Sequence, residues 1–318
     1  MKTDKKLFSY ETLAHAAAGA AGSVVGMTTF FPLDTVRSRL QLEDHREAKN
    51  TLAVVKDLVR EEGFSTLYRG LVPVLHSLCA SNFVYFYAFH GLRHSISAGP
   101  RGASAEKDLL LASVAGVINV LTTTPLWVVN TRLKMQGIQS NNEERVPVNR
   151  EHFHGLMDGL KKVYARGGIA ALWAGTVPSL VLVSNPAIQF AVYEALKRHV
   201  LVPSPGTSGS VARPSAFVAF LLGAIAKAVA TLITYPIQLI QTRLRHGHNL
   251  GGLKRDAGMF DMMIYILRRQ GVKGLYKGME AKILQTVLTA ALMFATYEKI
   301  VAFVLKLLLR NEYTPIKH

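Results

Sequence analysis

Long apolar runs without charged residues alternate along the chain with segments that carry many charges. The runs cover residues 12–33, 70–89, 109–131, 172–193, 214–242 and 283–297, and only the fifth is interrupted, by Lys227. Most of them approach or exceed the roughly 20 residues that a helix needs to cross about 30 Å of hydrocarbon. The last run is short, but residues 300–309 extend it almost without charge.

Backbone groups inside a membrane must form their hydrogen bonds within the segment, so these runs are expected to be helices. Hydrophobic residues make up 49% and charged residues 18% of the chain, and the mean hydropathy is +0.21. Soluble domains carry about 25% charged residues. The pattern predicts an all-α membrane protein with six transmembrane helices. A soluble protein with six buried helices is the less favoured alternative, because 318 residues offer little core to bury them.

The net charge of +16 could indicate a nucleic-acid partner. The basic residues, however, concentrate in three long connections, 46–69, 145–166 and 254–277, whereas the short connections 95–105 and 202–213 carry few. Such alternation is typical of a membrane protein with one basic face. That face suits anionic lipid headgroups or an anionic solute, and we expect no nucleic-acid partner.

Three landmarks recur in the same order three times. A proline stands seven residues before an arginine at Pro32, Pro125 and Pro236, and each proline is expected to kink its helix. Glycine-aromatic blocks follow at 63–70, 168–175 and 271–278, and an aromatic residue followed by histidine or glutamate stands at 89–90, 193–194 and 297–298. We predict a single domain, 1–318, of three repeats, about 9–95, 106–200 and 214–309.

Each repeat is expected to hold two spanning helices and a basic loop with a short amphipathic helix. In the first repeat this surface helix is predicted near residues 52–61. Leu52, Val55, Leu58 and Val59 are spaced there as on one helical face.

The motif Pro-x-[Asp/Glu]-x-x-[Lys/Arg], together with the glycine-aromatic blocks, resembles the mitochondrial carrier family over nearly the whole chain. Stretches 81–87, 123–130, 185–190 and 284–291 resemble more closely the peroxisomal members, which carry adenine nucleotides and coenzyme A. The resemblance implies a pseudo-threefold bundle of six helices around a central cavity, with both termini on the cytosolic side. It also implies a multi-pass protein of the peroxisomal membrane, with the mitochondrial inner membrane as the alternative.

In that family the acidic and basic motif residues pair between repeats and close the cavity on the side of the basic loops. Charges inside a bundle are costly unless paired, and paired charges can exchange partners when the cavity reopens. Only the first repeat keeps both charges, Asp34 and Arg37. Taken alone, these two residues could also form a local pair on one helix.

The other repeats carry uncharged residues at these positions, and the resemblance then implies hydrogen bonds in place of ion pairs. We expect Asn130 to bind Asp34 and Gln238 to bind Arg37, with Gln241 in the same ring. Gln41 matches the family's bracing glutamine, whereas Lys134 and Arg245 stand at the equivalent positions. Such a gate should open more easily than one of three ion pairs.

Polar residues within apolar spans are candidates for the substrate site. Lys227 is the foremost, because an ammonium facing an aqueous cavity attracts phosphate; the alternative is a lysine that extends to the membrane surface. Amides can bind the edge of a purine, and a tyrosine can stack on it. The further candidates on the even-numbered helices are Asn82, Tyr85, Asn185, Gln189 and Gln285.

Each of these five residues has the alternative role of joining helices by hydrogen bonds. Lys282 could add a second phosphate contact or lie at a helix mouth.

No catalytic or metal-binding motif occurs, so the chain is predicted to be a transporter and no enzyme, without a cofactor of its own. It lacks the phosphate-binding Gly-x-x-x-x-Gly-Lys-[Ser/Thr] loop, so ATP would be cargo and not fuel. The leading hypothesis is exchange of adenine-containing cofactors, namely ATP, AMP, coenzyme A, FAD or NAD, by alternating access. The alternatives are a membrane docking protein without transport and a carrier of small carboxylates.

Overall fold

The computed structural model describes residues 22–43, 46, 50–96, 105–136, 153–200, 215–247 and 258–292, and all regular structure in them is helical. Four stretches in this part of the chain are long and apolar enough to cross a membrane: Phe64–Ser95, Lys107–Lys134, Thr176–Val200 and Phe217–His246. They contain most of the second to fifth predicted spans. The first and sixth spans lie partly outside the described residues, as do the beginning of the first repeat and the end of the third.

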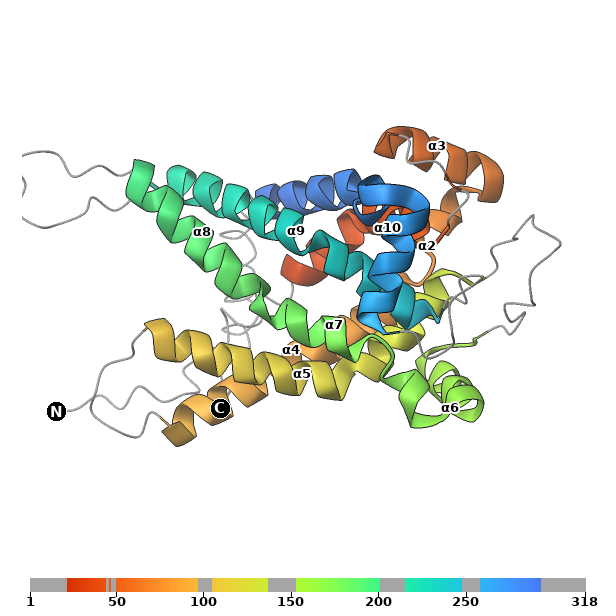
Figure 1. Cartoon of the computed structure of the whole chain (residues 1–318), viewed down its shortest axis with the longest axis horizontal. Coiled ribbons are helices and arrows are strands. Elements are labelled where there is room, and N and C mark those ends of the chain that lie inside the picture. The colour runs from red at the N-terminus through yellow and green to blue at the C-terminus, as the bar shows by residue number, and fades with distance from the viewer. Residues whose placement is uncertain are drawn as a thin grey trace, which may run out of the picture.

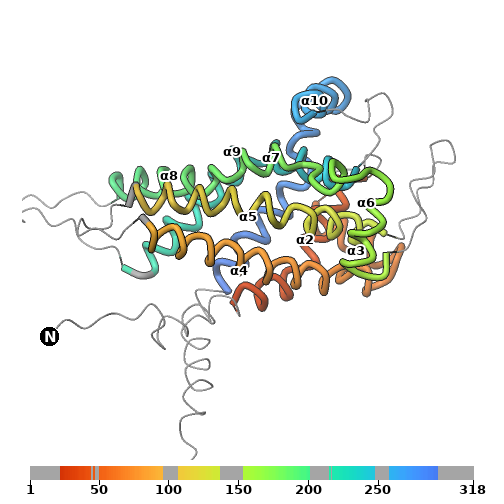
Figure 2. The backbone as a smooth tube through the Cα atoms, turned by 90° about the horizontal axis from the view of Figure 1, so that it is seen from below, coloured from red at the N-terminus to blue at the C-terminus, as the bar shows by residue number. Residues whose placement is uncertain are grey.

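Four long helices form the body of the molecule: α4 (Leu71–Ile96), α5 (Ala105–Lys134), α8 (Asn185–Val200) and α9 (Ala216–His246). Helix α4 packs along α5, and α8 packs along α9. The surface helices α3 (Thr51–Glu62), α6 (Leu156–Leu172) and α10 (Met259–Leu275) gather at one end of this body in both views (Figures 1 and 2). They overlap the predicted basic connections 46–69, 145–166 and 254–277, so this end is the loop side of the molecule.

Three hydrophobic clusters anchor these surface helices to the segments that follow the motif prolines. Val54 and Leu58 of α3 pack on Val36 and Leu40. The same arrangement joins α6 to α5 and α10 to α9, through Val163 on Val129 and Leu133, and through Met262 and Ile266 on Leu239 and Ile240. The amphipathic α3 is confirmed, but its buried face is rotated from the predicted one, because Leu52 is 64% exposed.

The glycine-aromatic blocks have the same local backbone in all three copies. Each block begins and ends with a glycine whose φ is positive, with values from 63° to 84° at Gly63, Gly70, Gly168, Gly175, Gly271 and Gly278. Residues with a Cβ rarely adopt this conformation. The spacing of the glycines therefore fixes the turn that leads from each surface helix into the next membrane span.

The motif prolines act differently in the three repeats. Helix α2 (Phe31–Leu42) starts at the first proline, and the chain leaves helical geometry at Phe30. Pro125 and Pro236 lie inside the continuous helices α5 and α9. A proline lacks the N–H that would bind the carbonyl four residues earlier. For Pro125 that carbonyl belongs to Leu121, and the indole N–H of Trp173 donates to it at 2.8 Å.

The fourth span is not one regular helix. It consists of α7 (Thr176–Val181), the 3₁₀ turn η2 (Leu182–Ser184) and α8. Pro186 is the second residue of α8, where a proline costs no helical hydrogen bond. This break places Asn185 at the start of α8, beside α9.

Candidate functional site

The loop-side ends of α2, α5 and α9 meet and carry the predicted gate. Asp34 of α2 is only 4% exposed, and its carboxylate forms an ion pair with Arg37 at 3.3 Å. It also accepts a hydrogen bond from the ammonium of Lys134 on α5. The predicted pairing of Asp34 with Asn130 is therefore wrong. Asn130 lies one turn earlier on α5 and is 1% exposed, and its side-chain amide has no hydrogen-bond partner in the described part of the chain.

The two glutamines of the third repeat bind elsewhere than predicted. Gln238 donates to Thr234 on its own helix at 3.1 Å, and among the described residues it accepts no hydrogen bond from Arg37, so the predicted pairing of Gln238 with Arg37 is also wrong. Gln241 donates to Ser179 of α7 at 2.8 Å, and Arg245 donates to the same hydroxyl at 3.1 Å. The third repeat is thus joined to the second at Ser179, whose hydroxyl accepts from a neutral and from a charged side chain.

Gln41, which was predicted to be a bracing residue, connects the first repeat to the third. Its amide donates to the Tyr235 hydroxyl at 3.0 Å, and this hydroxyl donates to the backbone carbonyl of Lys277 at 2.8 Å. The guanidinium of Arg243 donates to the backbone carbonyl of Gln41 at 2.9 Å. Gln41, Tyr235 and Arg243 are each at most 1% exposed, so these bonds form in a region without water access.

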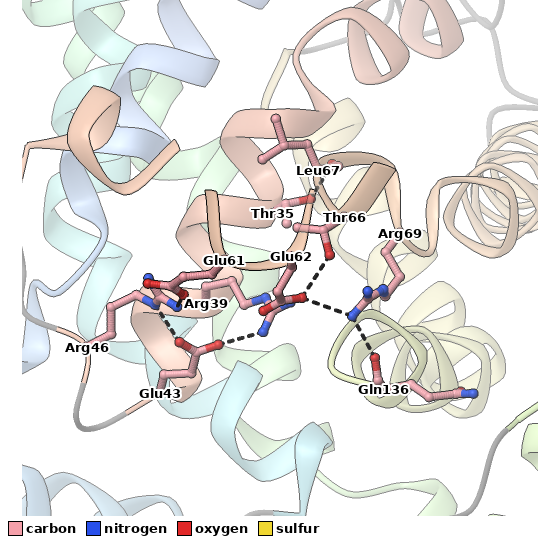
Figure 3. Close-up of polar contacts among 10 residues, drawn as sticks. All are labelled: Thr35, Arg39, Glu43, Arg46, Glu61, Glu62, Thr66, Leu67, Arg69 and Gln136. Atoms are coloured by element: carbon pink, nitrogen blue, oxygen red, sulfur yellow. Dashed lines mark hydrogen bonds and ion pairs between the residues drawn. The ribbon is translucent and has the colours of Figure 1, made fainter. Parts of the chain in front are cut away.

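Polar contacts continue outward from the gate in the first repeat (Figure 3). Arg39 binds Glu43 and Glu62 at 2.7 Å each, and Arg69 joins Glu62 to the backbone carbonyl of Gln136 after α5. Arg46 binds Glu43 at 2.5 Å. Burial alone would raise the pKa of the Glu43 carboxyl, but the hydrogen bonds and charges of Arg46 and Arg39 lower that pKa below its ordinary value.

Positive charge exceeds negative charge beside the gate. Asp34 is shared by two cations, Arg37 and Lys134. Lys282, on the helix over residues 279–292, is half-buried and forms no ion pair within the described residues. Lys227 lies half-buried in the middle of α9, and its side chain has no ion pair within the described residues.

The other predicted substrate residues are distributed over several helices. Asn185 donates to Thr234 of α9 at 2.7 Å, so it joins two helices and keeps only its carbonyl oxygen without a partner. Gln285 is 7% exposed, and its side-chain oxygen has no partner in the described chain. Asn82 and Gln189 are half-buried. Among the described residues, no hydrogen bond joins any two of the six predicted substrate residues.

A cavity of about 320 Å³ lies between α5 and the α7–α8 segment, with α4 and α9 at its sides. Tyr85 lines it and stacks on Phe89 at a centroid distance of 6.3 Å. The wall also contains aromatic, amide, hydroxyl and guanidinium groups from Asn119, Thr123, Trp127, Gln241 and Arg245. Its volume is near the lower end of the roughly 300–1,000 Å³ that ligand pockets span.

Sequence reasoning missed the parts played by Lys134, Arg245 and Trp173. Lys134 and Arg245 both stand at the position of the bracing Gln41, nine residues after a proline. Their positive charge on the face that carries the motif was the available signal. For Trp173, the signal was an indole N–H donor in the same repeat as Pro125, a proline that leaves one backbone carbonyl of its helix without a donor.

These observations define an all-α membrane carrier: apolar helices surround polar and charged groups, and neighbouring repeats are joined at one end. Comparison with protein families matches the family described as "Mitochondrial carrier protein" at residues 8–98, 102–203 and 212–307. The chain belongs to the mitochondrial carrier family, whose members are transporters and not enzymes.

Several curated proteins are similar over nearly the whole chain. Peroxisomal membrane protein PMP34 of Mus musculus is 51% identical over 301 residues, which are 93% of this chain and 94% of that protein. The peroxisomal nicotinamide adenine dinucleotide carrier of Arabidopsis thaliana is 35% identical, covering 95% of this chain and 98% of the relative. Peroxisomal adenine nucleotide carrier 1 of Arabidopsis thaliana is 31% identical, covering 92% and 91%.

Proposed function

We propose that the chain exchanges adenine-containing anionic cofactors, such as ATP, AMP, coenzyme A, FAD or NAD, across the peroxisomal membrane. The observation that carries this proposal is the excess of cations inside the bundle: Arg37 and Lys134 share Asp34, and the half-buried Lys227 and Lys282 have no ion pair among the described residues. Buried charge without a counter-ion is costly, so an anionic cargo supplies the missing partner. The names of two similar relatives, a dinucleotide carrier and an adenine nucleotide carrier, support the same class of cargo.

The transport cycle proposed here treats the chain as one domain of three repeats, about 9–95, 106–200 and 214–309. The contacts of Asp34, Gln41 and Gln241 hold the three repeats together on the loop side. Cargo binding at Lys227 offsets the cost of breaking these contacts, so that the loop side opens only when cargo is bound. The prolines at 32, 125 and 236 are the places where the helices bend during opening.

Exposed basic residues on the surface helices support a contact with anionic lipid headgroups. They are Lys56 and Arg60 on α3, Lys161 and Arg166 on α6, and Arg268, Arg269 and Lys273 on α10. Clusters of this kind next to a membrane attract anionic lipids.

Exchange measured in proteoliposomes tests the proposal. Vesicles that contain the purified protein and unlabelled ATP, coenzyme A, NAD or malate are given the same solute in labelled form outside, with protein-free vesicles as the blank. Adenine-containing cofactors should drive uptake, whereas malate should not. Uptake with malate alone would support the carboxylate carrier, and no uptake with any solute would support the docking protein.

A substitution locates the phosphate contact. K227Q should reduce ATP exchange strongly, whereas K107Q, a change of an exposed lysine near the start of α5, should leave it unchanged. Full exchange by folded K227Q protein would remove Lys227 from the site. The membrane assignment is tested by imaging a fluorescent fusion against peroxisomal and mitochondrial markers, and a mitochondrial signal would overturn it.

A further inference from the structure

A stripe of polar side chains runs along one face of α9. It consists of Lys227, Thr231, Thr234, Gln238, Gln241 and Arg245. The spacings alternate between four and three residues, which keeps these side chains on one side of the helix. The stripe has a charge at each end, and roughly 27 Å of helix separates Lys227 from Arg245 on the loop side.

The loop-side end of this stripe borders the cavity between α5 and the α7–α8 segment, where α7 lies beside α5 (Figure 1). Gln241 and Arg245 line the cavity from the third repeat, and Ser179 and Trp127 line it from the second. Among the described residues of its wall, Arg245 is charged and none is acidic. The cavity therefore presents a cation without a counter-ion, and burying such a charge is costly.

The guanidinium of Arg245 has donors that no described residue uses. Its Nη2 donates to the hydroxyl of Ser179 at 3.1 Å, whereas its Nε is enclosed and has no hydrogen-bond partner among the described residues. Gly175 lets the second repeat approach this side chain closely, because a Cβ atom there would be 3.1 Å from Cγ of Arg245. A guanidinium offers five N–H donors in a planar fork that matches the oxygens of a phosphate.

Ser179 is the contact that an anion in the cavity would replace. Its hydroxyl accepts from Arg245 and itself donates to the backbone carbonyl of Gly175 at 2.5 Å. A phosphate oxygen is a better acceptor for the guanidinium than a neutral hydroxyl, because both partners are then charged. An anion that takes Arg245 from Ser179 also removes one of the contacts between the second and third repeats.

The rest of the wall suits an uncharged body attached to the anion. Leu182 and Pro186 line it with apolar surface, and the rings of Tyr85 and Trp127 can stack on a base. A volume of about 320 Å³ has room for more than a free phosphate ion. The chemistry of the wall thus favours the phosphate end of a nucleotide over inorganic phosphate.

We propose that this cavity is a second site for the phosphate end of the cargo, with Arg245 as the residue that contacts the anion. The inference rests on the proposed function and adds a step to it. Cargo that leaves Lys227 moves along the polar stripe to Arg245, displaces Ser179 there and loosens the loop side.

Thermal unfolding of the full chain in detergent tests the second site, in a K227Q background that removes the first. ATP should still raise the unfolding temperature of K227Q protein, because the site at Arg245 remains. Adding R245Q should raise the half-maximal ATP concentration about tenfold or more, as expected for a lost charge-assisted contact. Adding R245K should keep more of the ATP response than R245Q does. R198Q, a change of an exposed arginine on α8, is the matched control and should have no effect.

The S179A change separates a cargo contact from a structural brace. If Ser179 competes with the phosphate for Arg245, K227Q/S179A should respond at a lower ATP concentration than K227Q, whereas R245Q shifts the response the other way. A brace would make both changes lower the unfolding temperature without cargo and leave the ATP response unaltered. That result, or no ATP response in K227Q protein, would overturn the second site.

Two further comparisons identify the source of the phosphate. ATP should act at a lower concentration than inorganic phosphate, and phosphatidylserine added to the detergent should leave the ATP response of K227Q unchanged. A response that the lipid abolishes would assign Arg245 to a lipid headgroup and overturn the proposal. If the unchanged protein neither exchanges nor binds ATP, the proposed function fails as well; if it exchanges ATP while K227Q/R245Q matches K227Q, only the second site fails.

Discussion

At the scale of residues, the ion pair of Lys134 with Asp34 joins the first and second repeats at the gate. Breaking a buried pair by removing one partner leaves the other charge without compensation, at a cost of about 3–5 kcal/mol. D34N and K134Q should therefore each lower the unfolding temperature and the rate of ATP exchange. The double variant D34N/K134Q should lose less than the sum of the two, which a double-mutant cycle measures. Strictly additive losses would show that the two side chains do not interact.

The choice of partner illustrates why residue pairs were harder to predict than residue types. The resemblance to the carrier family placed Asp34 and Asn130 in the gate, and both side chains are buried. It could not decide which side chain of α5 contacts Asp34, because the decision depends on how far each one reaches between helices. A lysine has a four-carbon stem, and the shorter Asn130 one turn away remains without a partner.

Glu43, which lies outside the membrane spans, gives the protein a pH-dependent contribution to stability. Arg46 and Arg39 lower its pKa below the ordinary value of 4.5 in the folded state. A lowered pKa contributes stability above the unfolded-state pKa, and this contribution disappears as the pH falls through the folded-state value. The unfolding temperature of E43Q should thus lie below that of the unchanged protein at pH 7, and the gap should narrow below about pH 4.5. A gap of constant size from pH 7 to pH 3 would refute this assignment.

At the scale of elements, hydropathy predicted the spans well where apolar length decides the outcome. The run at 109–131 becomes α5, and the run at 214–242 becomes α9. Hydropathy did not show that the fourth span breaks at η2, since the break arises from backbone geometry ahead of Pro186 and not from polarity. The rotated face of α3 was missed for a related reason: Leu52 and Val54 are both apolar, and only contact with α2 selects Val54.

The hydrogen bond from Trp173 to Leu121 offers a test at this scale. W173F removes the indole N–H. The backbone carbonyl of Leu121, which Pro125 leaves without a helical donor, then loses its hydrogen bond. A lost hydrogen bond of this kind costs about 1 kcal/mol, so the unfolding temperature should fall by a few degrees. In a P125A background the alanine N–H can bind Leu121 itself, and W173F should then cost much less. An equal cost in both backgrounds would show that Trp173 acts through packing.

For the whole molecule, the contacts across α2, α5 and α9 close the loop side, and in the proposed transport cycle cargo offsets the cost of opening it. Tyr235 is central to this closure, because its hydroxyl both accepts from Gln41 and donates to the carbonyl of Lys277. Y235F leaves two buried groups without partners, at about 1–3 kcal/mol each. The closed state becomes less stable, and the loop side should open without cargo more often.

The measurement compares two fluxes from vesicles loaded with labelled ATP: efflux into cargo-free buffer and efflux in exchange for external ATP. Y235F should raise the first relative to the second. Y276F is the matched control, because Tyr276 stacks on Tyr235 at 6.2 Å while its hydroxyl makes no hydrogen bond in the described chain. A Y235F protein that still releases ATP only in exchange would mean that closure of the loop side does not limit transport, and that the energy barrier lies at the opposite end of the bundle.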